Sequence, residues 1–510
     1  MLGTDTDVDA SFLEIGTKAA DIAAELWSGL GGDGEALSRL TFVGSGNLLC
    51  PFPVMDVAAA SFGVAGLAVS ELLAAAGMDA PTVMVDRRQA TTWFDFPLAP
   101  SRFLDVVEEH GIHQKWMVEF QTLDDRWIRI QATYPSLRRR MLSALELPMS
   151  AGPEHVQRAI GALTADEAET RLVAAGAAAA VARTIDEWDR HPQGMAVAKE
   201  SIADVRGTLP GGFAWRPTAG RPLLGLRVLD MTRVVAAPMA TRFLASLGAE
   251  VLRIDRPGSD EVSLIGVHDV SLGKRWAVLD ARSTEGRNDL RELIASTDVI
   301  VHGYRPGALD DLGLDADARA TLRRGLVDVT LNAYGWTGPW SDRRGFDTLV
   351  QFSSGIADEI SRWAGADPGR RLPINALGHH VDASRPRHMP VEALDFGTGY
   401  QMAAAALLGL VRRMKSGVGS YTRLSLARTA RVVVDHAMEP ADPTFRLPDD
   451  SAPVTEEIYG MGGRPTRRLA QPLVVDEVPM FWDRPAELPG SSMPVWSSPR
   501  PDSAESGPRA

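Results

Sequence analysis

The feature that most constrains the fold is an alternation of strand-like and helix-like segments in the middle of the chain. It begins with GLRVLDMTRVVAAPMATRFLASLGAEVLRIDRPGSDE at Gly225–Glu261. The apolar run Leu226–Leu229 predicts a strand. Pro238 suits the first turn of a following helix, because its missing N–H would be unpaired there anyway. A second strand-like segment, EVLRID, follows at Glu250–Asp255. This order predicts a βαβ unit, which requires a parallel sheet.

The alternation continues as far as Gly335. WAVLD, DVIVHGY and LVDVTLNAYG are strand-like, and the charged segment TEGRNDLRELIAST between the first two has helical character. The predicted fold class is therefore α/β, with a Rossmann-like, doubly wound parallel sheet.

Composition narrows the classes of function. A chain of 510 residues is too long for one ordinary core. Its formal net charge of −13 disfavours general binding to nucleic acid or to an anionic membrane. The lone cysteine, Cys50, suits a reducing cytoplasm, and the acidic N-terminus has no signal-peptide pattern. Since no stretch of about 20 apolar residues lacks a charge, we expect a cytoplasmic protein without a membrane span.

Six segments in order carry a resemblance to a known family. They are VLDMTRVVAAP, LGAEVLRIDRPG, LGKRWAVLD, HGYRPGALDDLGL, YGWTGPWSDRRGFDTLVQFSSG and VEALDFGTG. On these motifs, Gly225–Leu410 resembles the class III CoA-transferases, which include formyl-CoA and carnitine CoA-transferases and the α-methylacyl-CoA racemases. The resemblance implies acyl-CoA and a carboxylic acid as substrates, with no permanently bound cofactor.

The resemblance also implies a CoA site at the carboxyl ends of the strands, where open α/β sheets bind ligands. Arginines there would bind the phosphates by charge-assisted hydrogen bonds. The residues expected to contact CoA are Val235, Ala236, Arg256, Leu272, Gly273, Lys274, Tyr304, Arg305, Phe346 and Asp347.

Asp395 opens a run of small and apolar residues that predicts a buried helix. By resemblance it is the nucleophile that attacks the thioester and forms an aspartyl-acyl anhydride and then an aspartyl-CoA thioester. The following GTG at Gly397–Gly399 would leave room for backbone N–H groups to bind an oxyanion. The alternative is an aspartate that caps the helix, a role worth about 1 kcal/mol.

The identity of residue 346, a phenylalanine, favours CoA transfer over racemisation as the expected reaction. The racemases place a histidine immediately before the aspartate of this motif, whereas Phe346 cannot move a proton. Between this motif and Asp395 lies a polar insertion with His379, His380 and His388. Its composition predicts a surface loop and no metal site.

An internal repeat precedes the central segment. PFPVMDVAAASFGVAGLAVSELLAAAGMDAPTVMVD aligns without a gap on PVEALDFGTGYQMAAAALLGLVRRMKSGVGSYTRLS, so Asp56 falls on Asp395 and is the second candidate nucleophile. We expect this first copy to have no parallel sheet of its own. FQTLDDRWIRIQATYPSLRRRMLSALELP is similar to the family's small domain, in which a β-ribbon precedes a helix.

These observations divide the chain into three parts. Residues 1–220 form a carboxyl-terminal-type segment with the Asp56 helix and a smaller α+β domain at about 95–150. Residues 221–440 form the CoA-binding domain, and the Pro- and Ser-rich residues 441–510 form an extended arm, with LAQPLVVD pairing at a sheet edge and disorder from about Ser497.

The leading function is transfer of CoA between carboxylic acids, by a chain expected to form a homodimer as the family does. A non-catalytic relative that binds acyl-CoA is the alternative, and a racemase is a weaker one. The sequence does not identify the acyl group.

Overall fold

A seven-stranded sheet forms the centre of the computed structural model, which describes residues 18–95, 116–212, 214–259, 270–367, 384–440, 455–459 and 465–497. All neighbouring strands are parallel except β6, which is antiparallel to β12. In sheet order the strands are β6 (Asp204–Pro210), β12 (Val418–Ser425), β11 (Val327–Asn332), β10 (Val299–His302), β7 (Arg227–Met231), β8 (Glu250–Asp255) and β9 (Lys274–Val278). The predicted α/β fold class is confirmed.

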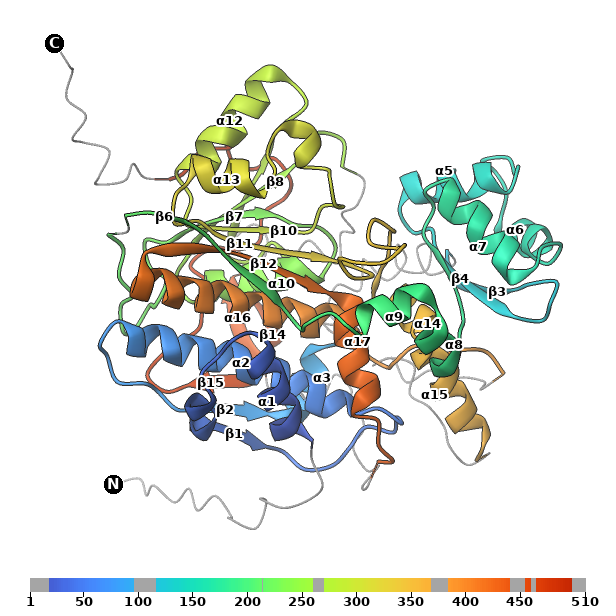
Figure 1. The fold of residues 1–510 in the computed structure, drawn as a ribbon, viewed down its shortest axis with the longest axis horizontal. Coiled ribbons are helices and arrows are strands. Elements are labelled where there is room, and N and C mark those ends of the chain that lie inside the picture. The colour runs from blue at the N-terminus through green and yellow to red at the C-terminus, as the bar shows by residue number, and fades with distance from the viewer. Residues whose placement is uncertain are drawn as a thin grey trace.

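Helices cover both faces of this sheet (Figure 1). Alternate residues of one strand point to opposite faces. Leu229 therefore packs with the apolar cluster of one face, and Val228 joins the cluster that includes the helices of the other. The first face carries α12 (Thr284–Ala295), α13 (Ala316–Leu322) and the short η5 (Asp310–Leu312); the second carries α10 (Ala236–Ser246) and α16 (Ala393–Ser416).

The strand order reverses between β7 and β10. From β7 the chain adds β8 and β9 on one side, and then returns to place β10 on the other side. Such a switch point leaves a crevice at the carboxyl ends of the two strands, where ligands of α/β proteins bind.

A second, smaller sheet lies beyond α16 (Figure 1). Helix α2 (Val54–Ala75) packs on α16, with the rings of Phe62 and Tyr400 3.9 Å apart. The other side of α2 faces a three-stranded sheet. Helices α1, η2 and α3 belong to the same part of the fold. These elements are β1 (Leu40–Val43), β2 (Val83–Asp86), β15 (Leu473–Val475), α1 (Ala19–Gly29), η2 (Gly34–Arg39) and α3 (Arg87–Trp93).

Helix α2 is apolar and long enough to cross a membrane by composition alone. Almost all of its residues are buried inside the protein, as in the core helix of a globular domain.

The two aligned segments of the predicted repeat have the same order of elements. Helix α2, strand β2 and helix α3 correspond to α16, β12 and α17 (Leu426–Asp435). Strand β2 has a parallel neighbour in β1 and an antiparallel one in β15, as β12 has in β11 and β6. The β1–β2 pair corrects the expectation that the first copy has no parallel sheet of its own.

The small domain has its own apolar core, which runs from Trp116 to Val181 and so extends beyond the expected end near residue 150. The predicted β-ribbon and helix are present and lie to one side of the central sheet (Figure 1). Its elements are β3 (Met117–Gln121), β4 (Trp127–Gln131), β5 (Ala179–Val181), α5 (Pro135–Ala144), α6 (Pro153–Ile160) and α7 (Ala165–Ala174). Four helices lie at the junction with the central domain: α8 (Ile185–Arg190), α9 (Pro192–Val197), α14 (Asp347–Ser353) and α15 (Ile356–Gly365).

The C-terminal arm supplies strands and covers an edge. It contains the hairpin β13 (Thr455–Tyr459) and β14 (Pro465–Leu469), followed by β15, which is the predicted edge strand. Further along, Trp276 of edge strand β9 donates its N–H to Glu487 and accepts the N–H of Ser492. The arm thereby covers groups that an open sheet edge would expose. The residues from 498 onward, for which the sequence predicts disorder, lie outside the described residues.

Candidate active site around Asp395

Asp395 lies in the first turn of α16 but does not cap it. The residue that precedes the helix, Glu392, makes no capping hydrogen bond with its side chain. The N–H groups of Leu394 and Asp395 both donate to Oδ2 of Asp347, at 2.9 and 2.8 Å. Asp347 therefore satisfies the first turn of the helix, and the capping alternative for Asp395 is wrong.

The Asp395 carboxylate, in contrast, receives no hydrogen bond from the residues that the structure describes. Asp395 is only 7% exposed, at the point where the first turn of α16 meets α14. A buried carboxylate without donors is costly, and such groups occur where chemistry requires them.

Asp347 is held by a short chain of hydrogen bonds. Its Oδ1 accepts from the side chain of Gln351, whose Oε1 in turn accepts the N–H of Met389 at 2.7 Å. Gln351 thus connects α14 to the segment that leads into α16. Sequence reasoning named Asp347 only as a contact to CoA and missed Gln351 altogether.

Asp347 and Asp395 lie in surroundings that disfavour their ionised forms. Burial raises the pKa of Asp347 to about 6, although three hydrogen bonds favour its ionised form. Burial, and then the charge of Asp347, raises the pKa of Asp395 well above the ordinary value of an aspartate. Asp395 is consequently a more basic carboxylate than an ordinary aspartate.

Of the two glycines after Asp395, Gly399 allows a close approach to α10, whereas Gly397 lies in ordinary contact with α2. A Cβ on Gly399 would lie 2.3 Å from the carbonyl oxygen of Ala236 at the start of α10, and one on Gly397 would lie 3.4 Å from Oγ of Ser61 in α2. Both glycines lie inside α16, where helical hydrogen bonds occupy their N–H groups. Their own N–H groups are therefore not free to bind an oxyanion, and the start of α10 lies against Gly399, one helical turn from Asp395.

The predicted CoA residues that follow β7, β8 and β10 lie at the carboxyl ends of these strands, as expected for this fold. Val235 precedes α10 and Ala236 is its first residue, at the end of the short turn after β7, and no side chain caps that helix. Arg256 follows β8, and Tyr304 with Arg305 follows β10. Both arginines are exposed, while Tyr304 is half-buried and its pKa is raised to about 12 by burial. Their contact with CoA stays a prediction.

The segment Leu272–Lys274 was also expected to contact CoA, but its surroundings differ from that expectation. Leu272 and the Lys274 side chain are buried, and the Lys274 ammonium binds Asp230 at 2.8 Å. The N–H of Gly273 donates to Arg484 of the C-terminal arm, and a Cβ on Gly273 would lie 2.3 Å from the ring of Trp482. In this arrangement the arm covers the loop, and the Lys274 ammonium is buried against Asp230.

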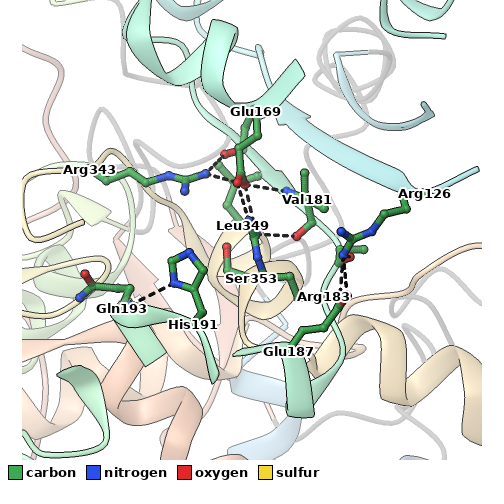
Figure 2. A network of polar contacts seen from close by, with 12 residues as sticks. Arg126, Glu169, Val181, Arg183, Glu187, His191, Gln193, Arg343, Leu349 and Ser353 are labelled. Atoms are coloured by element: carbon green, nitrogen blue, oxygen red, sulfur yellow. Dashed lines mark hydrogen bonds and ion pairs between the residues drawn. The ribbon is translucent and has the colours of Figure 1, made fainter. Parts of the chain in front are cut away.

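The small domain contacts the segment that contains Phe346 and Asp347. The ring of Phe346 stacks on Tyr134 of the small domain, with centroids 6.0 Å apart. Beside it, Glu169 of α7 joins two arginines from different parts of the chain, Arg183 and Arg343, with contacts of 2.5 and 2.8 Å (Figure 2).

This buried triad connects the small domain to the central domain. Burial would raise the pKa of Glu169, but Arg343 and Arg183 hold it at about 2. Its three members are far apart in the sequence and have no motif in common, so no sequence signal predicted it.

Asp56, the second candidate, has a different environment from Asp395. It is fully buried, its Oδ1 accepts from Nε of Arg87 at 2.7 Å, and its Oδ2 accepts the N–H of Lys18 at 3.2 Å. Arg87 falls on Leu426 in the repeat alignment, so a charge stands where the second copy has an apolar residue. That difference was the available sequence signal for the pair.

Two of the three histidines of the polar insertion, His379 and His380, lie outside the described residues. His388 contacts the backbone oxygen of Met389, and burial lowers its pKa to about 4. Among the described residues no group of three or more His, Cys, Asp or Glu side chains could hold a metal ion.

Comparison with known proteins finds a family that matches the central part of the chain. Residues 223–453 match CoA-transferase family III. The acetyl-coenzyme A transferase nodX of Hypoxylon pulicicidum is 34% identical over 235 residues, 44% of this chain and 36% of that protein. The succinyl-CoA:glutarate CoA-transferase of Homo sapiens is 28% identical over 256 residues, 47% of this chain and 54% of that protein.

Solved structures include a CAIB/BAIF family protein from Brucella suis, 27% identical, covering 43% of this chain and 57% of that chain with a TM-score of 0.36. The chain spans about half, or less, of the length of the curated relatives. The resemblance predicted from the motifs is confirmed over the central segment.

Proposed function

We propose that the protein transfers CoA between carboxylic acids, with Asp395 as the nucleophile. One observation carries the proposal: the Asp395 carboxylate has no donor among the described residues and is barely exposed, one helical turn from the contact of Gly399 with the start of α10. The match of residues 223–453 to CoA-transferase family III supports CoA transfer as the reaction class.

The reaction needs four exchanges at acyl carbons. The Asp395 carboxylate attacks the thioester carbonyl; the C–S bond breaks, and CoA leaves as the thiolate from a mixed anhydride. The thiolate attacks the aspartyl carbonyl of the anhydride and releases the donor as its carboxylate. The acceptor carboxylate then attacks the aspartyl-CoA thioester and displaces the thiolate again. Finally the thiolate attacks the acceptor's acyl carbon, forming the new thioester and regenerating Asp395.

The environment of Asp395 suits this exchange. A desolvated carboxylate with a raised pKa is more nucleophilic than a hydrated one, although only its ionised form reacts. Asp347 keeps the first turn of α16 in place through two backbone hydrogen bonds. It therefore fixes the position from which Asp395 attacks.

Asp56 makes a poor nucleophile by the same criteria. Its carboxylate is bound by Arg87 and by a backbone N–H, and it is inaccessible to solvent. We propose one reactive aspartate per chain, with the central and small domains of one chain contributing to the same site through the Glu169 triad.

Covalent trapping tests the proposal. The full chain is incubated separately with acetyl-CoA, succinyl-CoA and a fatty acyl-CoA, and peptides are analysed by mass spectrometry. We expect an adduct on the peptide containing Asp395, released by hydroxylamine, and no adduct in Asp395→Asn. Asp56→Asn is the matched control and keeps the adduct wherever circular dichroism shows it folded.

Two results would contradict the assignment. An adduct on the Asp56 peptide would make the first copy the reactive one. Binding of free CoA without any adduct across the panel would favour the alternative of an acyl-CoA-binding protein without catalysis.

A further inference from the structure

The turn between β7 and α10 contains a residue in a rare backbone conformation. Val234 has φ of +67°, in the left-handed region that β-branched residues avoid. Such a conformation persists only where the surroundings impose it, and it is found most often at functional sites. Val234 stands directly before Val235 and Ala236, the two backbone positions expected to face CoA.

A buried polar cluster lies beneath this turn. Asp230, near the end of β7, accepts at Oδ1 both the N–H of Thr232, at 3.0 Å, and the Thr232 hydroxyl, at 2.5 Å. Its other oxygen, Oδ2, accepts the hydroxyl of Thr241 at 2.6 Å and the Lys274 ammonium at 2.8 Å. Lys274 also donates to the carbonyl oxygen of Pro238 at 2.8 Å.

These contacts join both ends of the turn to one carboxylate. Thr232 lies on its strand side, whereas Pro238 and Thr241 lie on its helix side. With both ends fixed, the residues between Thr232 and α10 have little freedom. The turn also touches the helix that carries Asp395, since Ala236 packs against Gly399 of α16.

The charges of the pair do not reach solvent. The side chains of Asp230 and Lys274 are both 0% exposed. Burial lowers the pKa of Lys274 to about 8; burial would raise the pKa of Asp230, but Lys274 and the nearby Arg253 hold it below its ordinary value. A buried ion pair is weak evidence of added stability, because apolar residues of similar volume often replace it without loss. Its value here lies in the geometry that it imposes.

We propose that Asp230 and Lys274 are positioning residues that hold the Val234 turn in the conformation that presents the start of α10 to CoA. The proposal rests on the proposed CoA-transferase function, and it gives Lys274 a different role from the direct CoA contact that the motif implies. Neither side chain touches the substrate; both act through the turn.

The test compares a neutral pair with the charged one. Lys274→Met alone would leave an unpaired buried carboxylate and endanger folding, so the double variant D230N/K274M is used. We expect it to fold and to bind free CoA about 10- to 100-fold more weakly in calorimetry. Amide hydrogen exchange in residues 232–238 should accelerate, while exchange in the other strands of the sheet should not.

A second buried pair serves as the matched control. Arg319 of α13 and Asp328 of β11, a strand separated from β7 by β10, form an ion pair with side chains 3% and 4% exposed. The double variant R319M/D328N should lower the melting temperature to a similar degree and leave CoA affinity and exchange in 232–238 unchanged.

The substitution Val234→Gly, made in the parent and in D230N/K274M, completes a mutant cycle that decides whether the pair acts through the turn. Glycine adopts positive φ freely, so the turn would no longer need the pair. Adding Val234→Gly to D230N/K274M should restore at least 3-fold of the lost CoA affinity, whereas in the parent it should change affinity less than 2-fold. Equal effects in both backgrounds would overturn the proposal, as would unchanged exchange in 232–238.

The exchange measurement needs no ligand. If the parent chain fails to bind CoA, the proposed function fails, while the exchange data still decide whether the pair holds the turn.

Discussion

Replacing the two aligned aspartates by asparagine should change stability in opposite directions. Asp395 and Asp56 hold corresponding places in the first turns of α16 and α2. The Asp395 carboxylate lacks donors among the described residues and lies near a second acid, whereas Asp56 binds Arg87 at 2.7 Å. The substitution Asp395→Asn would remove an uncompensated charge, whereas Asp56→Asn would leave a buried guanidinium without its partner.

The pH dependence follows from the direction of the Asp395 shift. Its pKa is higher in the folded than in the unfolded protein, so the folded state binds more protons between the two values. The stability of the parent therefore falls as pH rises through this window. Asparagine does not titrate, and one pKa unit corresponds to about 1.4 kcal/mol. We expect Asp395→Asn to raise the free energy of unfolding at pH 8, by about 1.4 kcal/mol for each unit by which the folded pKa exceeds the unfolded one, and to change it little at pH 4.

Asp56→Asn should instead lower the free energy of unfolding by about 3–5 kcal/mol, the usual cost of breaking a buried pair. Urea unfolding of the parent and both variants at pH 4, 6 and 8 measures these differences. A stabilisation by Asp395→Asn that is absent, or equal at pH 4 and pH 8, would refute the reasoning about the uncompensated carboxylate. A neutral effect of Asp56→Asn would show that the Arg87 pair is dispensable.

Three further predictions concern CoA binding, the triad and the first copy of the repeat. Arg256→Ala and Arg305→Ala should each weaken binding of free CoA by about 1.5–3 kcal/mol, the value of a charge-assisted phosphate contact; calorimetry in which both bind like the parent would remove the proposed site. Glu169→Gln should cost about 3 kcal/mol at neutral pH, since the pKa of Glu169 is held at about 2 rather than the ordinary 4.5. That contribution is present above pH 4.5 and lost as pH falls towards 2, so acid unfolding of the Gln variant should lose this steep step. A fragment of residues 1–220 lacks both α16 and β15 and should aggregate; a soluble fragment with a cooperative melting transition would contradict this.

The central sheet could be predicted because its signals are local. Strands of a parallel sheet are buried on both faces and read as continuous apolar runs, and the helices between them are amphipathic. The segment EVLRID predicts a strand at Glu250–Asp255, the bounds that β8 has in the structure. The strand order, and with it the switch point between β7 and β10, depends on long-range pairing that no single segment specifies. The path of the arm along β9 could not be predicted either, because its contacts join residues more than 200 positions apart.

The repeat shows why the site itself was harder to predict than the fold. Asp56 and Asp395 occupy aligned positions on helices of like composition, so the sequence offered both as nucleophiles. What separates them is a neighbour contributed by another element: Arg87 of α3 in one copy and Asp347 of α14 in the other. Burial raises the pKa of both aspartates; Arg87 opposes that shift at Asp56, whereas the charge of Asp347 adds to it at Asp395. Identical residue types thus acquire different surroundings through partners 31 and 48 positions away in the chain. A search for nucleophiles in a chain with two aligned candidate segments should therefore ask which charged side chain faces each candidate before it counts motif matches.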